Sequence, residues 1–165
     1  LGPLGNGFPI QETEGRRVLL LGGGIGIPPM LGTAAVPGVC ATAVLGYRDE
    51  MFLEREFEEF CPVLVATEDG SHGVKGNVLD VIRENDINAD MIFACGPAPM
   101  LRAVKDYAEK AQIPCWISME ERMACGIGAC LGCVCDTVQE DSHSHVHRKR
   151  VCKDGPVFRS TEVRL

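Results

Sequence analysis

Four cysteines near the C-terminal end of the chain have the spacing of a metal-cluster site. Thiolates bind iron in iron–sulfur clusters, and a C-x4-C-x2-C run with a distant fourth cysteine is typical of plant-type [2Fe–2S] sites. The chain presents this spacing at Cys125, Cys130, Cys133 and Cys152. The sequence therefore predicts a [2Fe–2S] cluster held by these four side chains.

The residues between these cysteines favour tight turns, in which backbone N–H groups can point at sulfur. Gly126, Gly128 and Ala129 have little or no side chain. Two alternatives stay open: a zinc ion held by four thiolates, and four buried cysteines without a metal. Zinc sites usually pair two C-x2-C units, and Cys152 has no such neighbour, which favours the cluster. We predict that Cys135 is a packing residue on a strand that leaves the cluster.

A glycine-rich motif earlier in the chain could bind a dinucleotide. It follows a short apolar run and opens a helical pattern, a context in which glycines let the backbone approach a pyrophosphate. Ile27 stands where the G-x-G-x-x-G fingerprint has its last glycine, so a plain tight turn is the alternative. The residues that we expect to bind the cofactor here are Gly22, Gly23, Gly24, Gly26 and Pro28.

Two further loops should lie beside this motif, because ligands bind outside the carboxyl ends of the strands in open α/β sheets. The cofactor-binding residues that we predict in them are Thr67, Asp69, Gly70, Ser71, Cys95, Gly96, Pro97 and Met100. Cys95 is explained equally well as a buried core residue. Arg48 and Asp49 lie near the expected position of a 2′-phosphate, and they do not decide between NAD and NADP.

Short apolar runs alternate with helical patterns as far as residue 118. Continuous runs, as opposed to alternating ones, are typical of strands buried on both faces of a parallel sheet. The runs span 18–21, 39–45, 63–66, 91–94 and 115–117, and the helical patterns span 28–36, 49–60, 77–84 and 97–112. We therefore predict an α/β fold with an open, doubly wound parallel sheet of five strands and a small C-terminal [2Fe–2S] cysteine-rich subdomain.

This pattern divides the chain into three expected parts. Residues 1–14 form an interdomain linker, 15–118 a pyridine-nucleotide-binding domain, and 119–165 a cluster-binding subdomain. The last part has too few aliphatic side chains for a core of its own, so we expect the cluster to organise it. Its His-rich insertion, residues 141–150, is predicted to be a solvated hairpin tip, with a second metal site as the alternative.

Composition excludes several classes of function. The net charge is −7, and phosphate binding needs a basic surface, so we expect no nucleic-acid partner. No run approaches the roughly 20 apolar residues of a membrane span, and the N-terminus has no signal-peptide pattern. Nine cysteines without a secretion signal suit a reducing compartment. We expect a cytoplasmic protein with no membrane association.

These motifs resemble those of the ferredoxin–NADP reductase superfamily and, within it, the electron-transfer subunits of NAD-dependent dihydroorotate dehydrogenase. Segments 22–29 and 95–97 resemble the G-x-G-I-x-x-x-P and C-G-P motifs of the superfamily's NAD domain. Segments 120–135 and 150–158 are close to the cysteine-rich end of the dihydroorotate dehydrogenase subunits, and 2–8 is similar to their interdomain segment. The resemblance implies NAD, a [2Fe–2S] cluster and an FMN-containing catalytic subunit, joined in a heterotetramer. Electrons from dihydroorotate oxidation would pass from FMN through the cluster to FAD, and then as hydride to NAD+.

The chain departs from that family at its beginning. The family's FAD motifs lie in a β-barrel that precedes the interdomain segment, and this chain starts at that segment. A flavin must link a one-electron cluster to a two-electron nicotinamide, so we expect FAD only with the N-terminal domain present, and a truncated chain that is inactive alone. The alternatives are a related iron–sulfur flavoprotein reductase subunit, of the sulfide dehydrogenase or ferredoxin–NADP oxidoreductase type, and a zinc-stabilised, non-enzymatic binding module.

Overall fold

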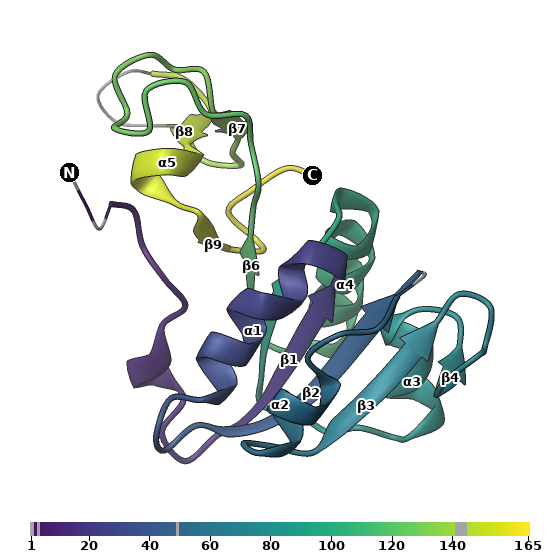
Figure 1. Cartoon of the computed structure of the whole chain (residues 1–165). Coiled ribbons are helices and arrows are strands. Elements are labelled where there is room, and N and C mark those ends of the chain that lie inside the picture. The colour runs from purple at the N-terminus through teal and green to yellow at the C-terminus, as the bar shows by residue number, and fades with distance from the viewer. Residues whose placement is uncertain (1, 3, 49, 141–144) are drawn as a thin grey trace.

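A computed structural model describes residues 2, 4–48, 50–140 and 145–165 of the chain (Figure 1). Its centre is a seven-stranded sheet with the order β4-β3-β2-β1-β5-β6-β9. Neighbouring strands pair in parallel except β9, which runs antiparallel to β6. The strands are β1 (Arg17–Gly23), β2 (Cys40–Tyr47), β3 (Val63–Thr67), β4 (Val74–Lys75), β5 (Met91–Cys95), β6 (Cys115–Ser118) and β9 (Val157–Arg159).

The predicted α/β fold with its five parallel strands is confirmed, and the sheet is wider than predicted by one strand at each edge. β4 has two residues and β9 has three, which is too short for either to leave an apolar run in the sequence. β9 comes from the C-terminal part of the chain and pairs with β6 through the register Ile117–Phe158. The cysteine-rich part is therefore attached to the main sheet by backbone hydrogen bonds.

Helices cover both faces of this sheet (Figure 1). The main helices are α1 (Ile27–Ala34), α2 (Glu54–Glu58), α3 (Val78–Glu84) and α4 (Ala98–Ala111). Because successive side chains of a strand point to opposite faces, Leu19 joins the core under α3 and α4, whereas Leu20 joins the core under α1 and α2. Both leucines are fully buried. This two-sided burial accounts for the continuous apolar runs in the sequence.

The helix ends show where local sequence decided the fold. The predicted helical pattern 77–84 begins at a cap, Asn77: its Oδ1 accepts from Leu79 N–H at 2.9 Å, and Asp80 Oδ2 accepts from Asn77 N–H at 2.9 Å. α2 is much shorter than the predicted span 49–60. It begins only after Leu53, whose φ of +63° interrupts any helix that approaches from the N-terminal side.

The C-terminal part lies beyond the end of β6 (Figure 1). β7 (Val134–Asp136) and β8 (Arg148–Arg150) form an antiparallel pair, and α5 (Val151–Asp154) follows. Three apolar side chains of the C-terminal part, Val151, Phe158 and Val163, join the core under α4. By contrast, residues 119–132, all of which the structure describes, contain no buried side chain and no helix or strand. The sequence predicted too few aliphatic side chains for a core in residues 119–165. The structure shows that the stretch without buried side chains is the loop 119–132.

The β7–β8 pair makes the His-rich insertion part of a hairpin connection. Residues 141–144 of that insertion lie outside the described residues, as does Asp49 in the loop after β2. His145 and His147 are exposed. His145 Nδ1 lies 3.0 Å from Glu140 Oε1, and His147 Nδ1 lies 3.2 Å from the Val138 carbonyl oxygen.

The N-terminal segment runs beside the C-terminal part. Asn6 N–H donates to the Gly155 carbonyl oxygen at 2.7 Å, and Asn6 Oδ1 accepts from Val157 N–H at 3.1 Å. Phe8 stacks on Phe93 of the sheet with ring centroids 4.8 Å apart. The segment then enters the 3-10 turn η1 (Ile10–Glu12) before β1. The three-part division of the chain stays a prediction.

No described helix is both long enough and apolar enough to span a bilayer.

Candidate functional site

A cleft with a volume of about 660 Å³ opens at the carboxyl ends of the parallel strands. β1 lies between β2 and β5, so the order of the strands reverses there. Open α/β sheets bind ligands outside such a switch point. The predicted nucleotide residues that line the cleft are Gly23, Gly24, Gly26, Cys95, Gly96, Pro97 and Met100.

Glycines hold the two central loops of the cleft against each other. A Cβ added to Gly26 would lie 2.6 Å from Gly96 N, and one added to Gly96 would lie 3.2 Å from Gly23 N. A Cβ on Gly23 would lie 3.1 Å from Pro97 Cδ. Side chains at these positions would push the loops apart. The turn η2 (Gly24–Gly26) leads directly into α1, which gives the cleft a helix N-terminus of the kind that suits a pyrophosphate.

Two predicted residues of the glycine motif, Gly22 and Pro28, do not line the cleft. Gly22 is buried in β1, where a Cβ would lie 3.0 Å from Ile27 Cγ1. Pro28 is exposed in the first turn of α1, and its neighbour Pro29 lines the cleft. Gly22 thus serves the packing of α1 on the strand.

The predicted residues of the loop after β3 also lie outside the cleft wall, because they hold the loop together. Thr67 Oγ1 donates to the His72 carbonyl oxygen at 2.8 Å and accepts from His72 N–H at 3.2 Å. Asp69 Oδ1 accepts from Ser71 N–H at 2.9 Å, and Gly70 supplies a φ of +78°. Glu68, which the sequence did not single out, reaches the cleft.

Sequence reasoning missed further residues of the cleft. They lie at the end of β2, at the start of α3 and after β6: Gly46, Tyr47, Asn77, Val78, Ser118, Met119 and Glu120. Apart from Asn77 and Val78, these residues lie at the carboxyl ends of predicted strands. The strand-end rule that pointed to the other loops could therefore have found them.

Cys95 was predicted either to contact the cofactor or to be a buried core residue, and its position suits both roles. It is half-buried and packs against the core under α1, and it also lines the cleft. Burial raises the pKa of its thiol, with a smaller opposing contribution from a hydrogen bond to Ser118. The side chain is therefore a neutral thiol at neutral pH.

The four predicted cluster ligands come together as two pairs of thiols. The Cys125 side chain lies beside that of Cys130, and the Cys152 side chain lies beside that of Cys133. Cys133 and Cys152 are buried, Cys125 is half-buried and Cys130 is exposed. Two irons with two thiolates each fit such an arrangement.

Backbone N–H groups point at the sulfurs of this loop. Ala129 N–H donates to Cys125 Sγ at 3.3 Å, and Gly132 N–H donates to Cys130 Sγ at 3.4 Å. At the buried end, Cys152 N–H donates to Cys133 Sγ at 3.4 Å. These donors stabilise thiolates, and the chemistry of the donor set fits a [2Fe–2S] cluster.

The positions of the glycines explain how a short loop makes these contacts. Gly126 and Gly128 have φ values of +68° and +82°, in the left-handed region that side chains disfavour. Hydrogen bonds from the backbone, that of Ile127 first and that of Cys130 next, lower the pKa of the Cys125 thiol to about 6. Cys125 is therefore a thiolate at neutral pH, the form that binds metal.

Cys135 differs from the four ligands in position and charge. It lies buried on β7 within the core that Val151 and Phe158 share, and burial raises the pKa of its thiol. Across the described part of the chain, no three His, Cys, Asp or Glu side chains are already gathered in the geometry of a bound metal, so the four thiols form two pairs and no preformed metal site.

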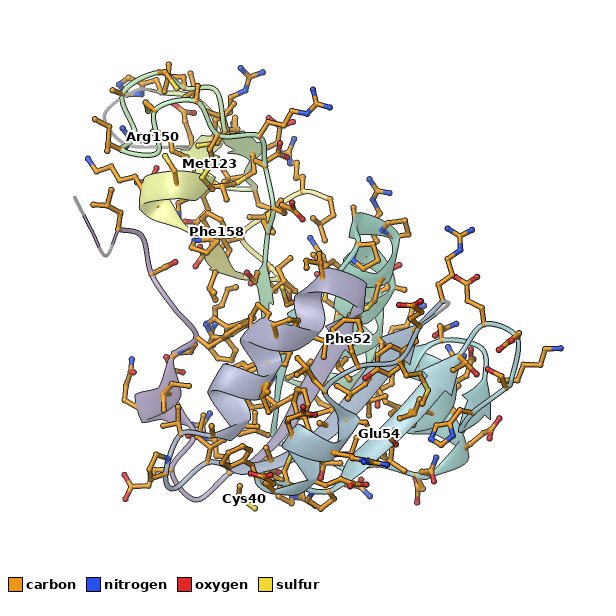
Figure 2. All side chains as sticks on the ribbon, viewed as in Figure 1. Cys40, Phe52, Glu54, Met123, Arg150 and Phe158 are labelled. Atoms are coloured by element: carbon orange, nitrogen blue, oxygen red, sulfur yellow. The ribbon has the colours of Figure 1, made fainter. Side chains whose placement is uncertain are left out.

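Arg150 joins the segment of Cys152 to the cysteine loop, residues 119–132. Arg150 Nε donates to Asp154 Oδ2 at 2.9 Å, and Arg150 also donates to the Gly128 carbonyl oxygen at 3.2 Å. The same arginine keeps the pKa of Asp154 below its ordinary value. Figure 2 shows Arg150 in the part of the molecule that carries the cysteine loop, at the opposite end from Cys40. The ion pair orients the Arg150 guanidinium, and its hydrogen bond to Gly128 ties the segment of Cys152 to the loop of the other predicted ligands.

Comparison with known proteins finds similarity to dihydroorotate dehydrogenase B, both in the cysteine-rich part and along the whole chain. The family model of the iron–sulfur cluster binding domain of dihydroorotate dehydrogenase B matches residues 120–164. The electron transfer subunit of dihydroorotate dehydrogenase B (NAD(+)) from Geobacillus sp. strain WCH70 is 50% identical, over 100% of this chain and 64% of that protein. The same subunit from Caldanaerobacter subterraneus is 48% identical, over 98% of this chain and 64% of that protein. Along its whole length, the chain is similar to the electron-transfer subunits of dihydroorotate dehydrogenase B.

The predicted resemblance to this family is confirmed. The chain spans 64% of the length of these relatives. A solved structure of an NADH-dependent reduced ferredoxin–NADP oxidoreductase is similar as well, with a TM-score of 0.81 and 30% identity over 99% of this chain and 59% of that chain. The dihydroorotate dehydrogenase B subunits are thus more similar to the chain in sequence than this oxidoreductase is.

Proposed function

We propose that this chain is the nucleotide-binding and cluster-binding part of an electron-transfer subunit of NAD-dependent dihydroorotate dehydrogenase. Cys125, Cys130, Cys133 and Cys152 would hold a [2Fe–2S] cluster, a group that supplies one-electron transfer. The observation that carries the proposal is the arrangement of these four thiols in two pairs, with backbone N–H groups aimed at their sulfurs.

The chain's own residues prepare the site for a charged group. The N–H groups of Ala129 and Gly132 offset negative charge on the exposed thiolates, and the pair of Arg150 with Asp154 holds α5 in place. The buried ligands Cys133 and Cys152 exclude water from the inner side. An exposed outer side and a covered inner side suit exchange of electrons with a partner at the surface.

In the cleft, the glycine loops would bind the pyrophosphate of NAD. Gly24 is exposed with open space beside its backbone, and the start of α1 offers a favourable dipole. Cys95 and Ser118, at the ends of β5 and β6, would then contact the nicotinamide half. Hydride transfer to NAD+ also requires a flavin, so the chain acts with FAD bound by a further domain.

The partner that we propose is an FMN-containing catalytic subunit, assembled with this chain in a heterotetramer. It would oxidise dihydroorotate to orotate in pyrimidine biosynthesis. We place the complex in the cytoplasm. None of the nine cysteines, all of which are described, forms a disulfide, which suits a reducing compartment.

An anaerobic reduction experiment tests this function. The cluster-loaded chain is mixed with the FMN-containing catalytic subunit, and dihydroorotate is added without NAD. We expect the visible absorption of the cluster to bleach only when both the catalytic subunit and dihydroorotate are present. Bleaching with reduced ferredoxin or NADPH, but not with dihydroorotate, would favour a reductase of the ferredoxin–NADP oxidoreductase type and overturn the proposal.

A further inference from the structure

The nucleotide cleft has two chemically different ends, one on each side of the glycine loop of β1. Over β5 and β6, its wall contains Cys95, Ser118 and Glu120. Over β2 and β3, it contains Arg48 and Glu68. Because the sheet places β1 between these two pairs of strands, a dinucleotide with its pyrophosphate at the β1 loop must extend one nucleoside toward each end.

The position of the cysteine loop determines which nucleoside lies at which end. The chain leaves β6 at Ser118 and runs directly into residues 119–133, which carry three of the four cluster ligands. Redox chemistry therefore belongs to the β5–β6 end, and the nicotinamide with it. The adenosine half must then lie over β2 and β3, beside Arg48 and Glu68. This step rests on the proposed function.

Arg48 and Glu68 form an ion pair at that end of the cleft. Arg48 Nε lies 3.6 Å from Glu68 Oε2, and the two side chains are 79% and 66% exposed. Their backbones are joined as well, because Glu68 N–H donates to the Tyr47 carbonyl oxygen at 3.3 Å. Arg48 is the single cation among the described residues that line the cleft. A carboxylate therefore stands beside the one side chain that could attract a phosphate.

We propose that Glu68 is a specificity-determining residue that reserves the adenosine end for NAD over NADP. The two dinucleotides differ at the ribose 2′-position, which carries a neutral hydroxyl in NAD and a phosphate in NADP. A carboxylate accepts a hydrogen bond from the hydroxyl, whereas an arginine accommodates the phosphate. Glu68 repels a 2′-phosphate and at the same time occupies Arg48. Removing its charge releases Arg48 to bind the phosphate.

Calorimetric titration of the full chain with two probes tests this role. The probes are ADP-ribose and 2′-phospho-ADP-ribose, which carry the adenosine half without the nicotinamide ring. We expect the wild-type chain to bind ADP-ribose more tightly. In Glu68→Gln, we expect the ratio of the two Kd values to move toward the phosphorylated probe by about fivefold, the effect of a pair of unit charges about 4 Å apart in water.

Two further variants separate the pair from the general effect of charge. The double variant Arg48→Gln, Glu68→Gln should lose the gain for the phosphorylated probe, because the cation that would bind the phosphate is gone. Glu84→Gln makes the same change of net charge at an exposed position at the end of α3, outside the cleft wall. It should leave the ratio within about twofold of wild type. Because Glu68 is largely exposed, Glu68→Gln should keep the fold, which circular dichroism checks.

The outcomes distinguish this inference from the proposed function beneath it. If both probes bind and Glu68→Gln leaves their ratio unchanged, Glu68 does not set specificity, and the nucleotide cleft stands. If Glu84→Gln shifts the ratio as far as Glu68→Gln does, the effect is one of net charge and the inference is wrong. If neither probe binds the wild-type chain, the nucleotide cleft is wrong and the inference falls with it.

Discussion

The nucleotide cleft and the cysteine loop are stabilised in opposite ways. The cleft rests on strands whose side chains are fully buried, such as Leu20, Leu21 and Phe93, and its loops are held by backbone packing at glycines. The cysteine loop, residues 119–132, has no buried side chain and no regular secondary structure in the described chain. Burial of apolar surface organises the first site. The second depends on its ligands.

This contrast resembles the behaviour of small metal-binding domains, in which metal binding supplies folding free energy. The loop is anchored at both sides, at β6 and at Cys133 with Cys152, and its large apolar side chains Met123, Ile127 and Leu131 are exposed. Bonds from four thiolates to one group would supply the contacts that apolar packing does not. We therefore expect a change in the cysteine loop to leave the nucleotide cleft unaffected, and a change in the cleft to leave the loop unaffected.

The largest effect should come from Cys130→Ser. Cys130 is exposed, so its replacement removes a ligand without disturbing any packing. We expect the iron and acid-labile sulfide of anaerobically purified protein to fall nearly to zero, while circular dichroism shows the helices and sheet unchanged. An undiminished [2Fe–2S] EPR signal in this variant would refute the ligand assignment.

Cys135→Ser is the matched control for that variant. Cys135 lies buried on β7, in the same core cluster as Cys133 and Cys152 but outside the C-x4-C-x2-C run. We expect full iron content, with a decrease of about 1–2 kcal/mol in the free energy of unfolding, because the serine hydroxyl is buried in place of the thiol.

Removing the cluster from the wild-type chain should loosen one region and spare the other. After anaerobic chelation, we expect amide hydrogen exchange to accelerate across 119–133, since these backbone groups lose the ligands that hold them. Amides of β1 should exchange as before, because the sheet keeps its core. Equal acceleration in both regions would contradict the independence of the two sites.

Gly26→Ala should damage the cleft and spare the loop. Its Cβ would collide with the backbone of Cys95 and Gly96. We expect ADP-ribose binding to weaken by about tenfold or more and the unfolding free energy to fall by about 1–3 kcal/mol, as for other overpacked sites. Iron content should stay normal.

Gly32→Ala is the matched control for Gly26→Ala. Gly32 lies in α1 beside open space, and a Cβ added there would meet no neighbouring atom within 4 Å. We expect unchanged ADP-ribose binding and a gain of up to about 1 kcal/mol in stability, because alanine is the better helix former. Loss of binding in this control would show that α1 tolerates no change, and the collision argument would fail.

A smaller effect is expected from Arg150→Gln, which breaks the link between α5 and the cysteine loop. The variant keeps all four thiols but loses the contacts with Asp154 and Gly128. We expect several-fold faster release of iron to a chelator and a changed EPR line shape. Arg148→Gln, which removes the exposed pair with Asp136, should release iron at the wild-type rate. Identical rates in the two variants would show that the pair with Asp154 does not position Cys152.

Much of the sheet and of the glycine motif could be predicted because their causes are local. Continuous apolar runs marked the five parallel strands, and the helical pattern 77–84 marked α3. β9 could not be predicted, because three residues carry no periodicity and its pairing with β6 depends on how the cysteine-rich part folds back. A helix was predicted over 49–60, but α2 begins only after Leu53. The positive φ of Leu53 causes this late start, and no pattern in the sequence indicates it.

The candidate site divides in the same way. The cysteine spacing named the four ligands because cluster geometry restricts which residues can converge. The loop after β3 was predicted to contact the nucleotide through Thr67 and Asp69, but both bond within their own loop, and Glu68 reaches the cleft. Polar residues in a loop satisfy backbone groups as readily as they bind ligands, and composition does not separate these roles.

Iron and acid-labile sulfide analysis of anaerobically purified protein tests the central claim most directly. The account predicts equal amounts of the two, two of each per chain, with a rhombic EPR signal after reduction by dithionite. One zinc per chain without sulfide, in protein prepared with iron in excess, would contradict it.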